Sequence, residues 1–219
     1  MIKSKYNQPL EKFKNLHNGG TAILFTTGPS LSKYVSLPNS EKYIKIGVNR
    51  IYNYPDILSN LNYYYYGSHY YLDEEHRKNI DIICTKNKNI TTLASAYEDG
   101  RSHKDINRGN INPERANELN SLPFENTLHT FTNDVAEYCT LGHSIVFPPL
   151  QHILYMGIKK LYLVGCDGGF TQGKSSYDEH LLYWWKKFVE FKNTYYPDVE
   201  IISVNPVSLK GWFDQDIYI

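Results

Sequence analysis

Short apolar runs alternate with longer segments of mixed polarity along this chain of 219 residues. The runs are rich in β-branched and aromatic residues and end near glycine, asparagine or serine, which is typical of buried strands. Strands are therefore predicted within the segments 21–26, 42–49, 61–68, 80–85, 89–95, 159–170 and 199–206.

The segments between these runs carry the spacing and end signals of helices. The clearest is 178–196, which is amphipathic. In 29–37 and 144–157 the prolines fall near the start, where a missing N–H does no harm to a helix. Two further helices are expected at 9–18, which ends at two glycines, and at 69–80.

Strands that alternate with helices predict an α/β fold, here a single Rossmann-like domain with a mostly parallel sheet and helices on both faces. The domain is expected to span 1–219. The polar segment 98–127, rich in Asn, Gly and Pro, departs from the alternation. Long loops inside compact domains are usually functional or mobile, so 98–127 is predicted to be a lid or excursion near the site.

Charge and composition narrow the function. Lys+Arg and Asp+Glu balance at 23 each, which argues against a nucleic-acid partner. No apolar run approaches the ~20 residues of a membrane helix, and the polar start does not resemble a secretory signal. Cys84, Cys139 and Cys166 lack CxxC spacing, which indicates reduced thiols in a cytoplasmic protein. The 20 tyrosines are attributed mainly to AT-biased coding, although tyrosine also suits stacking on sugars and bases.

Polar residues follow the predicted strands, and ligands of parallel sheets bind beyond the carboxyl ends of the strands. The stretch TTGPS at 26–30 combines a glycine that permits close backbone approach with a following helix start, which favours an anion such as phosphate. The hydroxyls of Thr27 and Ser30 would add donors. An ordinary turn is the alternative interpretation of this stretch.

Two further strand ends offer candidate ligand groups. The amide of Asn49 would bind a phosphate or a ribose, or it would only cap a turn. The carboxylate of Asp167, among glycines, would bind a ribose hydroxyl, or it would cap the next turn.

The histidines show no HExxH or comparable spacing, so neither a metal site nor a cofactor is predicted. No GxSxG motif is present, which argues against a serine hydrolase. His17 and His76 are expected at the surface. His180 is expected in the first turn of helix 178–196, with His69 and His143 as other histidines near predicted element ends.

The order of these motifs resembles the bacterial lipooligosaccharide sialyltransferases of glycosyltransferase family 42. The resemblance rests on TTGPSL, VNRIYNY, YGSHYYL, SIVFPPLQHILYMGIKKLYLVGCD, GKSSYDEH and NPVS, in that order along the chain. A weaker similarity, through GPSL and the G-x-D strand end, is to the pterin-pyrophosphokinase-like domain of flagellin-modifying proteins.

The sialyltransferase resemblance implies roles for individual residues. Nucleotide contacts are implied for a group that follows the strands and starts a helix: Thr27, Gly28, Ser30, Asn49, Ser68 and Ser144. Tyr177 resembles a tyrosine that hydrogen-bonds the leaving phosphate, and His180 resembles the general base that deprotonates the acceptor hydroxyl. Neutral donors would stabilise the leaving CMP without a metal, and an imidazole has a suitable pKa for the acceptor proton.

Departures from the family pattern keep other functions open. No Arg precedes Ser144, and the segment 168–179 is far shorter than the family's lid. The resemblance implies a sialyltransferase-like enzyme that moves a sugar from a nucleotide donor, with a CMP-sugar favoured, to a hydroxyl acceptor without a metal. The alternatives are a pterin-type pyrophosphokinase-like enzyme and a non-catalytic nucleotide- or glycan-binding module. The donor sugar, the acceptor and a homo-oligomeric state are left open.

Overall fold

The computed structural model describes residues 10–67, 74–86, 89–95, 116–119, 131–136, 139–140, 144–169 and 175–219. In this part of the chain, eight strands form one sheet in the order β5-β4-β3-β2-β1-β6-β7-β8, and all seven neighbouring pairs are parallel. The strands are β1 (Thr21–Phe25), β2 (Ile44–Val48), β3 (Tyr63–Gly67), β4 (Thr91–Ser95), β5 (Ala116–Leu119), β6 (Lys160–Val164), β7 (Glu200–Val204) and β8 (Gln215–Ile217).

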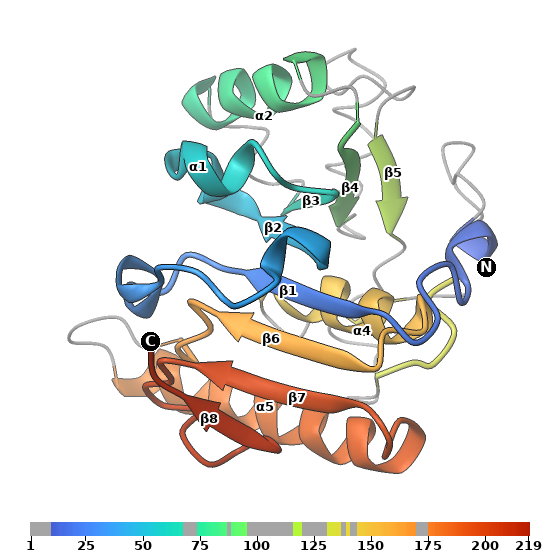
Figure 1. Cartoon of the computed structure of the whole chain (residues 1–219), viewed down its shortest axis with the longest axis vertical. Coiled ribbons are helices and arrows are strands. Elements are labelled where there is room, and N and C mark those ends of the chain that lie inside the picture. The colour runs from blue at the N-terminus through green and yellow to red at the C-terminus, as the bar shows by residue number, and fades with distance from the viewer. Residues whose placement is uncertain are drawn as a thin grey trace.

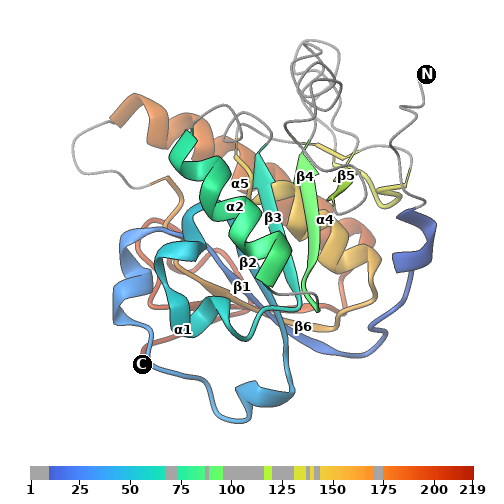
Figure 2. The same ribbon diagram turned by 90° about the horizontal axis from the view of Figure 1, so that it is seen from above.

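Helices cover both faces of this sheet, as Figures 1 and 2 show. The α-helices are α1 (Pro55–Leu58), α2 (Glu74–Lys86), α4 (Phe147–Tyr155) and α5 (Ser175–Tyr195). Short 3₁₀ helices lie at η1 (Leu10–Phe13), η2 (Pro29–Lys33), η3 (Ser40–Lys42) and η4 (Asn49–Asn53). The predicted α/β class with a parallel sheet is confirmed. Among the described residues, no helix is long and apolar enough to cross a membrane.

Alternation along the strands separates two cores. Ala22 and Leu24 of β1 share a core with α4 and α5, while Ile23 and Phe25 share the other core with α2, η2 and η4. All nine residues of α4 are buried, including the polar Gln151 and His152, so this helix lies within the larger core. The two cores share the sheet, which places every central strand between two apolar layers.

One predicted strand is wrong: residues 80–85 belong to α2. Ile80 and Ile83 are buried, whereas Ile82 between them is 45% exposed. Spacing of three residues is the helical period, and the acidic pair Glu74 and Glu75 favours a helix start at this point. The apolar run was too short to distinguish a strand from one helix face.

The helix predicted at 9–18 is only a 3₁₀ turn, because Asn15 has a left-handed backbone with φ 56°. The helix predicted at 29–37 is likewise shortened to the five residues of η2. The predicted lid 98–127 lies largely outside the described residues, and its described part is β5, a strand of the sheet. Strand β8 was not predicted at all.

Candidate functional site

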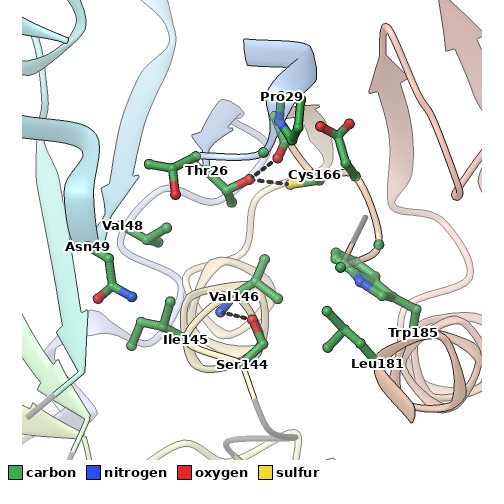
Figure 3. A pocket seen from close by; sticks show the side chains of 16 residues that line it. Thr26, Pro29, Val48, Asn49, Ser144, Ile145, Val146, Cys166, Leu181 and Trp185 are labelled. Atoms are coloured by element: carbon green, nitrogen blue, oxygen red, sulfur yellow. Dashed lines mark hydrogen bonds between the residues drawn. The ribbon is translucent and has the colours of Figure 1, made fainter. Parts of the chain in front are cut away.

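The strand order reverses between β1 and β6, which are neighbours at the centre of the sheet. In parallel α/β sheets such a switch point opens a crevice at the carboxyl ends of the strands. A pocket of about 540 Å³ lies at this point (Figure 3). Its lining comes from the ends of β1, β2 and β6, from the start of α4 and from α5: Thr26, Thr27, Gly28, Pro29, Val48, Asn49, Ser144, Ile145, Val146, Gly165, Cys166, Asp167, Gly168, Gly169, Leu181 and Trp185.

Five residues expected to contact a nucleotide line this one pocket, namely Thr27, Gly28, Asn49, Ser144 and Asp167. They could be predicted as neighbours because each follows a strand or precedes a helix at the same edge of the sheet. Their roles toward a ligand remain predictions. Ser68, His69 and His143 lie outside the described residues, so the structure does not place them.

The backbone of TTGPS is used differently from the predicted anion cradle. The N–H of Gly28 donates to the carbonyl of Gly165 at 2.9 Å, and the N–H of Ser30 donates to Oδ2 of Asp167 at 2.7 Å. The N–H of Leu31 donates to the carbonyl of Gly28, and Pro29 has no N–H. No backbone donor from 28 to 31 is therefore left for a phosphate, and the carboxylate of Asp167 takes the position expected for the anion.

Gly28 is required by the close approach of β1 and β6. A Cβ on this residue would lie 2.3 Å from the carbonyl oxygen of Gly165 and 2.6 Å from Oδ2 of Asp167. Thr26 strengthens the same junction, because its hydroxyl donates to the Gly165 carbonyl and lies 3.5 Å from Sγ of Cys166. Burial raises the pKa of the Cys166 thiol to about 12, so this thiol stays protonated and is a poor nucleophile.

Asp167 supplies an acceptor beside the pocket. The residue is 4% exposed, and its Oδ1 is buried with no hydrogen-bond partner. The hydroxyl of Ser30, which does not line the pocket, is also buried and unpartnered. Buried polar atoms without partners are rare, and a ligand hydroxyl or an ordered water is the usual explanation.

Donors lie at the opposite side of the pocket. Ser144 lies in the turn three residues before α4, which begins at Phe147 rather than at the predicted residue 144, and its Oγ accepts a long hydrogen bond of 3.4 Å from the N–H of Val146. Pro148 and Pro149 remove two backbone donors from the first turn of α4. The helix start therefore offers a positive dipole end and one hydroxyl rather than a row of N–H groups. Asn49 adds a side-chain amide.

The proposed catalytic residues lie on α5. His180 is exposed, in the second turn of the helix rather than the predicted first turn, and it is not among the pocket-lining residues. It directly precedes Leu181, which does line the pocket. Tyr177 lies one helical turn before Leu181 along the backbone of α5.

The apolar part of the lining was missed by the sequence analysis. Ile145, Leu181 and Trp185 line the pocket, and Trp185 is buried with its indole N–H unpartnered. Apolar side chains in amphipathic helices look like ordinary core. The available signal was positional, because 181 and 185 are one turn apart on a helix that follows the glycine-rich end of β6.

His76 is not at the surface as expected. Its ring is buried against η4 and accepts from the guanidinium of Arg50, with the Nη2 of Arg50 3.0 Å from Nε2. The hydroxyl of Tyr52 contacts the other ring nitrogen. This cluster joins α2 to the end of β2 on the face opposite α4, so the side chain of Arg50 is directed to α2.

No protein-family model matches the chain, and no curated protein matches it in sequence. Solved structures do match in fold. The sialyltransferase CstII from Campylobacter jejuni, in complex with CMP-3FNeuAc, superposes with a TM-score of 0.51 at 15% sequence identity, over 84% of this chain and 79% of that one. The same enzyme with cytidine-5′-monophosphate gives 0.48 at 15% identity over the same shares of the two chains.

An α-2,3/8-sialyltransferase CstII mutant gives a TM-score of 0.47 at 17% identity, covering 84% of this chain and 80% of that one. The resemblance to bacterial sialyltransferases that the sequence motifs indicated is thus confirmed as a likeness of fold to CstII.

Proposed function

We propose that the chain is a glycosyltransferase that binds a nucleotide sugar, with a CMP-sugar favoured, in the pocket at the switch point. The observation that carries this proposal is the convergence of Thr27, Gly28, Asn49, Ser144 and Asp167 on one pocket of about 540 Å³. Small-molecule sites commonly measure ~300–1,000 Å³ and combine apolar walls with a few polar groups. A fold shared with a solved sialyltransferase supports the same class of ligand.

The polar groups of the pocket favour one orientation of the proposed nucleotide. Asp167 presents an unpartnered acceptor, which suits a ribose hydroxyl. Ser144, at the positive end of α4, and the Asn49 amide suit the phosphate. The carboxylate of Asp167 would repel a phosphate at its own end, so the nucleotide would lie with its ribose toward β6 and its phosphate toward β2 and α4.

The proposed chemistry needs one proton transfer. An acceptor hydroxyl attacks the anomeric carbon of the donor sugar, the bond from that carbon to the phosphate oxygen breaks, and CMP leaves with the electron pair. His180 takes the acceptor proton and Tyr177 hydrogen-bonds the leaving phosphate. These residues act without a metal in this proposal. In this proposal the reaction takes place beside Leu181, where the exposed side chain of His180 would meet a glycan acceptor.

Ligand binding is tested by thermal shift against CMP, UDP, GDP and ADP and their sugars. A ligand present at ~100 times its Kd adds about 2.7 kcal/mol of stability, which a melting curve resolves readily. Stabilisation by CMP and CMP-sugars supports the proposal. A protein that none of these compounds stabilises is not a nucleotide-sugar enzyme.

Catalysis is tested by His180→Ala in a transfer assay with the donor found above. Removal of a general base is expected to lower kcat by ~10²–10⁴ while the Kd of the nucleotide stays nearly unchanged. Lys186→Ala is the matched control, because Lys186 is also exposed on α5. A His180→Ala protein with the kcat of the Lys186→Ala control would remove His180 from the mechanism.

The second candidate is a non-catalytic nucleotide- or glycan-binding module. The observation that favours it is the position of His180, exposed and outside the pocket lining. This candidate gives nucleotide-dependent stabilisation without transfer, and without hydrolysis of the bound donor, for every acceptor tried.

A further inference from the structure

Asn49 directly follows β2 and has a backbone conformation that asparagine adopts more readily than most residues. Its φ is 44°, in the left-handed region, and η4 begins here and folds back over the sheet. Gly47 makes room for this return. A Cβ on Gly47 would lie 2.8 Å from Cγ2 of Ile51 in η4 and 2.7 Å from Cδ1 of Leu61. The turn at Asn49 is therefore held against β2 by packing.

Two hydrogen bonds from β3 hold Asn49 from the side. The hydroxyl of Tyr64 donates to the main-chain carbonyl of Asn49 at 2.7 Å. The N–H of Gly67 donates to Oδ1 of the Asn49 side chain at 3.0 Å. Tyr64 itself is rigid, because its ring is fully buried and stacks on Tyr66 with ring centroids 6.0 Å apart. One rigid strand thus fixes both the backbone and the amide of Asn49.

This arrangement decides which end of the amide faces the pocket. A backbone N–H can only donate, so the atom opposite Gly67 must be the oxygen of the Asn49 amide. The NH₂ group then lies on the other side, and Figure 3 shows it directed away from β3, on the side of Ile145. The β2 side of the pocket presents a donor, which requires an acceptor atom on the ligand.

We infer that Tyr64 is a positioning residue for a phosphate-bearing ligand: by holding the carbonyl of Asn49 it keeps the Asn49 NH₂ directed at the phosphate oxygens. The inference rests on the proposed function for the identity of the ligand. Tyr64 does not line the pocket and acts only through Asn49.

The test compares Tyr64→Phe with Tyr63→Phe by titration calorimetry with CMP and with cytidine. Tyr63→Phe is a matched control, because its hydroxyl also makes a 2.7 Å hydrogen bond, to Nε2 of His17, from the amino end of the same strand. Tyr64→Phe is expected to raise the Kd of CMP about tenfold and to leave that of cytidine within about twofold. Tyr63→Phe is expected to change neither.

A purely structural role would weaken CMP and cytidine binding equally, and that result would overturn the inference. An unchanged CMP affinity in Tyr64→Phe would do the same. Asn49→Asp is the second variant. It keeps an oxygen opposite Gly67 but places a carboxylate oxygen where the NH₂ stood, so CMP binding should fall by more than tenfold while cytidine binding remains.

A readout without ligand separates this inference from the proposed function. The side-chain NH₂ resonances of Asn49 in a ¹⁵N spectrum are assigned by their loss in Asn49→Asp. Tyr64→Phe should shift them, and Tyr63→Phe should not. If the wild type binds no nucleotide but the resonances respond in this way, the proposed function fails and the positioning of Asn49 by Tyr64 stands. If the Asn49 NH₂ resonances do not shift in Tyr64→Phe, the positioning of Asn49 by Tyr64 is refuted, whatever the protein binds.

Discussion

Gly28 lies where the backbones that leave β1 and β6 approach each other closely. Its hypothetical Cβ overlaps a backbone carbonyl, which cannot rotate away as a flexible side chain could. We expect Gly28→Ala to lower the free energy of unfolding by ~1–3 kcal/mol through forced backbone shifts. Urea denaturation measures it, with the exposed Lys33→Ala of η2 as a control expected within ~0.5 kcal/mol of wild type. Equal free energies of unfolding for the two variants would show that the backbone at Gly28 accommodates a Cβ, and would contradict this prediction.

His152 gives the protein a pH dependence on the acid side. Burial lowers the pKa of this fully enclosed imidazole from 6.5 to about 3, with a smaller effect from His17. Its Nδ1 contacts the hydroxyl of Tyr65, and its Nε2 has no partner. A charged imidazolium in this place would lack both solvent and a counter-ion.

The sign of the effect follows from which state binds the proton. The unfolded chain protonates His152 near pH 6.5 while the folded protein does not, so stability is full above that pH and falls as the pH drops toward 3. At pH 5 the loss from His152 is about 2 kcal/mol relative to neutral pH. Urea denaturation midpoints at pH 7.5 and pH 5.0 measure this loss of stability. His152→Gln should flatten the difference, and a variant with the same pH dependence as wild type would refute the assignment.

At the scale of elements, the side chain of Gln151 links α4 to the segment before it. Gln151 is 1% exposed, and its Oε1 accepts from the N–H groups of Thr132 and Thr140, each at 3.2 Å. Its Nε2 donates to the carbonyls of Thr140 and Phe147. The described residues 131–136 and 139–140 form no helix and no strand beyond an isolated bridge at Cys139, so this amide replaces the partners that a strand or helix would supply.

Gln151→Leu keeps the volume but removes the Oε1 acceptor that the buried N–H groups of Thr132 and Thr140 share. The expected loss in the free energy of unfolding is roughly 2–5 kcal/mol. Ile153→Val, two residues further on the same buried helix, should cost only ~0.5–1.5 kcal/mol. Urea denaturation of both variants checks the difference, and a smaller effect for Gln151→Leu than for Ile153→Val would contradict the role assigned to the amide.

The elements show what a single sequence can and cannot predict. The central strands β1, β2, β3, β6 and β7 were predicted because their apolar runs end in clear turn residues. Residues 80–85 were misassigned because an apolar run of six fits one helix face equally well. Strands β5 and β8 were missed because edge strands need fewer apolar residues and so lack the pattern.

Part of the candidate site could also be predicted from the sequence. Thr27, Asn49 and Asp167 were predicted as neighbours from topology alone, since parallel strands end at one edge. The use of the backbone donors after Gly28 could not be predicted, because it depends on Asp167, 137 residues away from Ser30. The tyrosines of β3 were attributed to coding bias. Yet the hydroxyls of Tyr63, Tyr64 and Tyr65 each meet a polar partner in the structure.

At the scale of the whole molecule, we expect one cooperative unfolding transition. The two cores share a single sheet, so neither can lose its packing without exposing the other side of the same strands. Trp184 and Trp185 are buried and Trp212 packs against the same core, on the face covered by α4 and α5. Tryptophan fluorescence therefore reports the unfolding of the core on one face of the sheet, and far-UV circular dichroism reports the loss of secondary structure in the whole protein.

The two signals should give coincident urea transitions if the chain is a single domain, as proposed from its sequence. Transitions that separate would divide the chain into two units that unfold independently. Saturating CMP should move both signals together, because the pocket draws its lining from both sides of the switch point.

The position of β1 between β2 and β6 has a consequence for synthesis. Thr26 and its partner Gly165 are 139 residues apart in the chain. At ~5–20 residues per second, a ribosome needs roughly 7–30 s to make the intervening segment. Throughout that interval the edge of β1 that later pairs with β6 has no neighbour, although β1 can already pair with β2. A central strand of the finished sheet thus has an open edge in the nascent chain, the kind of surface on which chains associate wrongly and chaperones act.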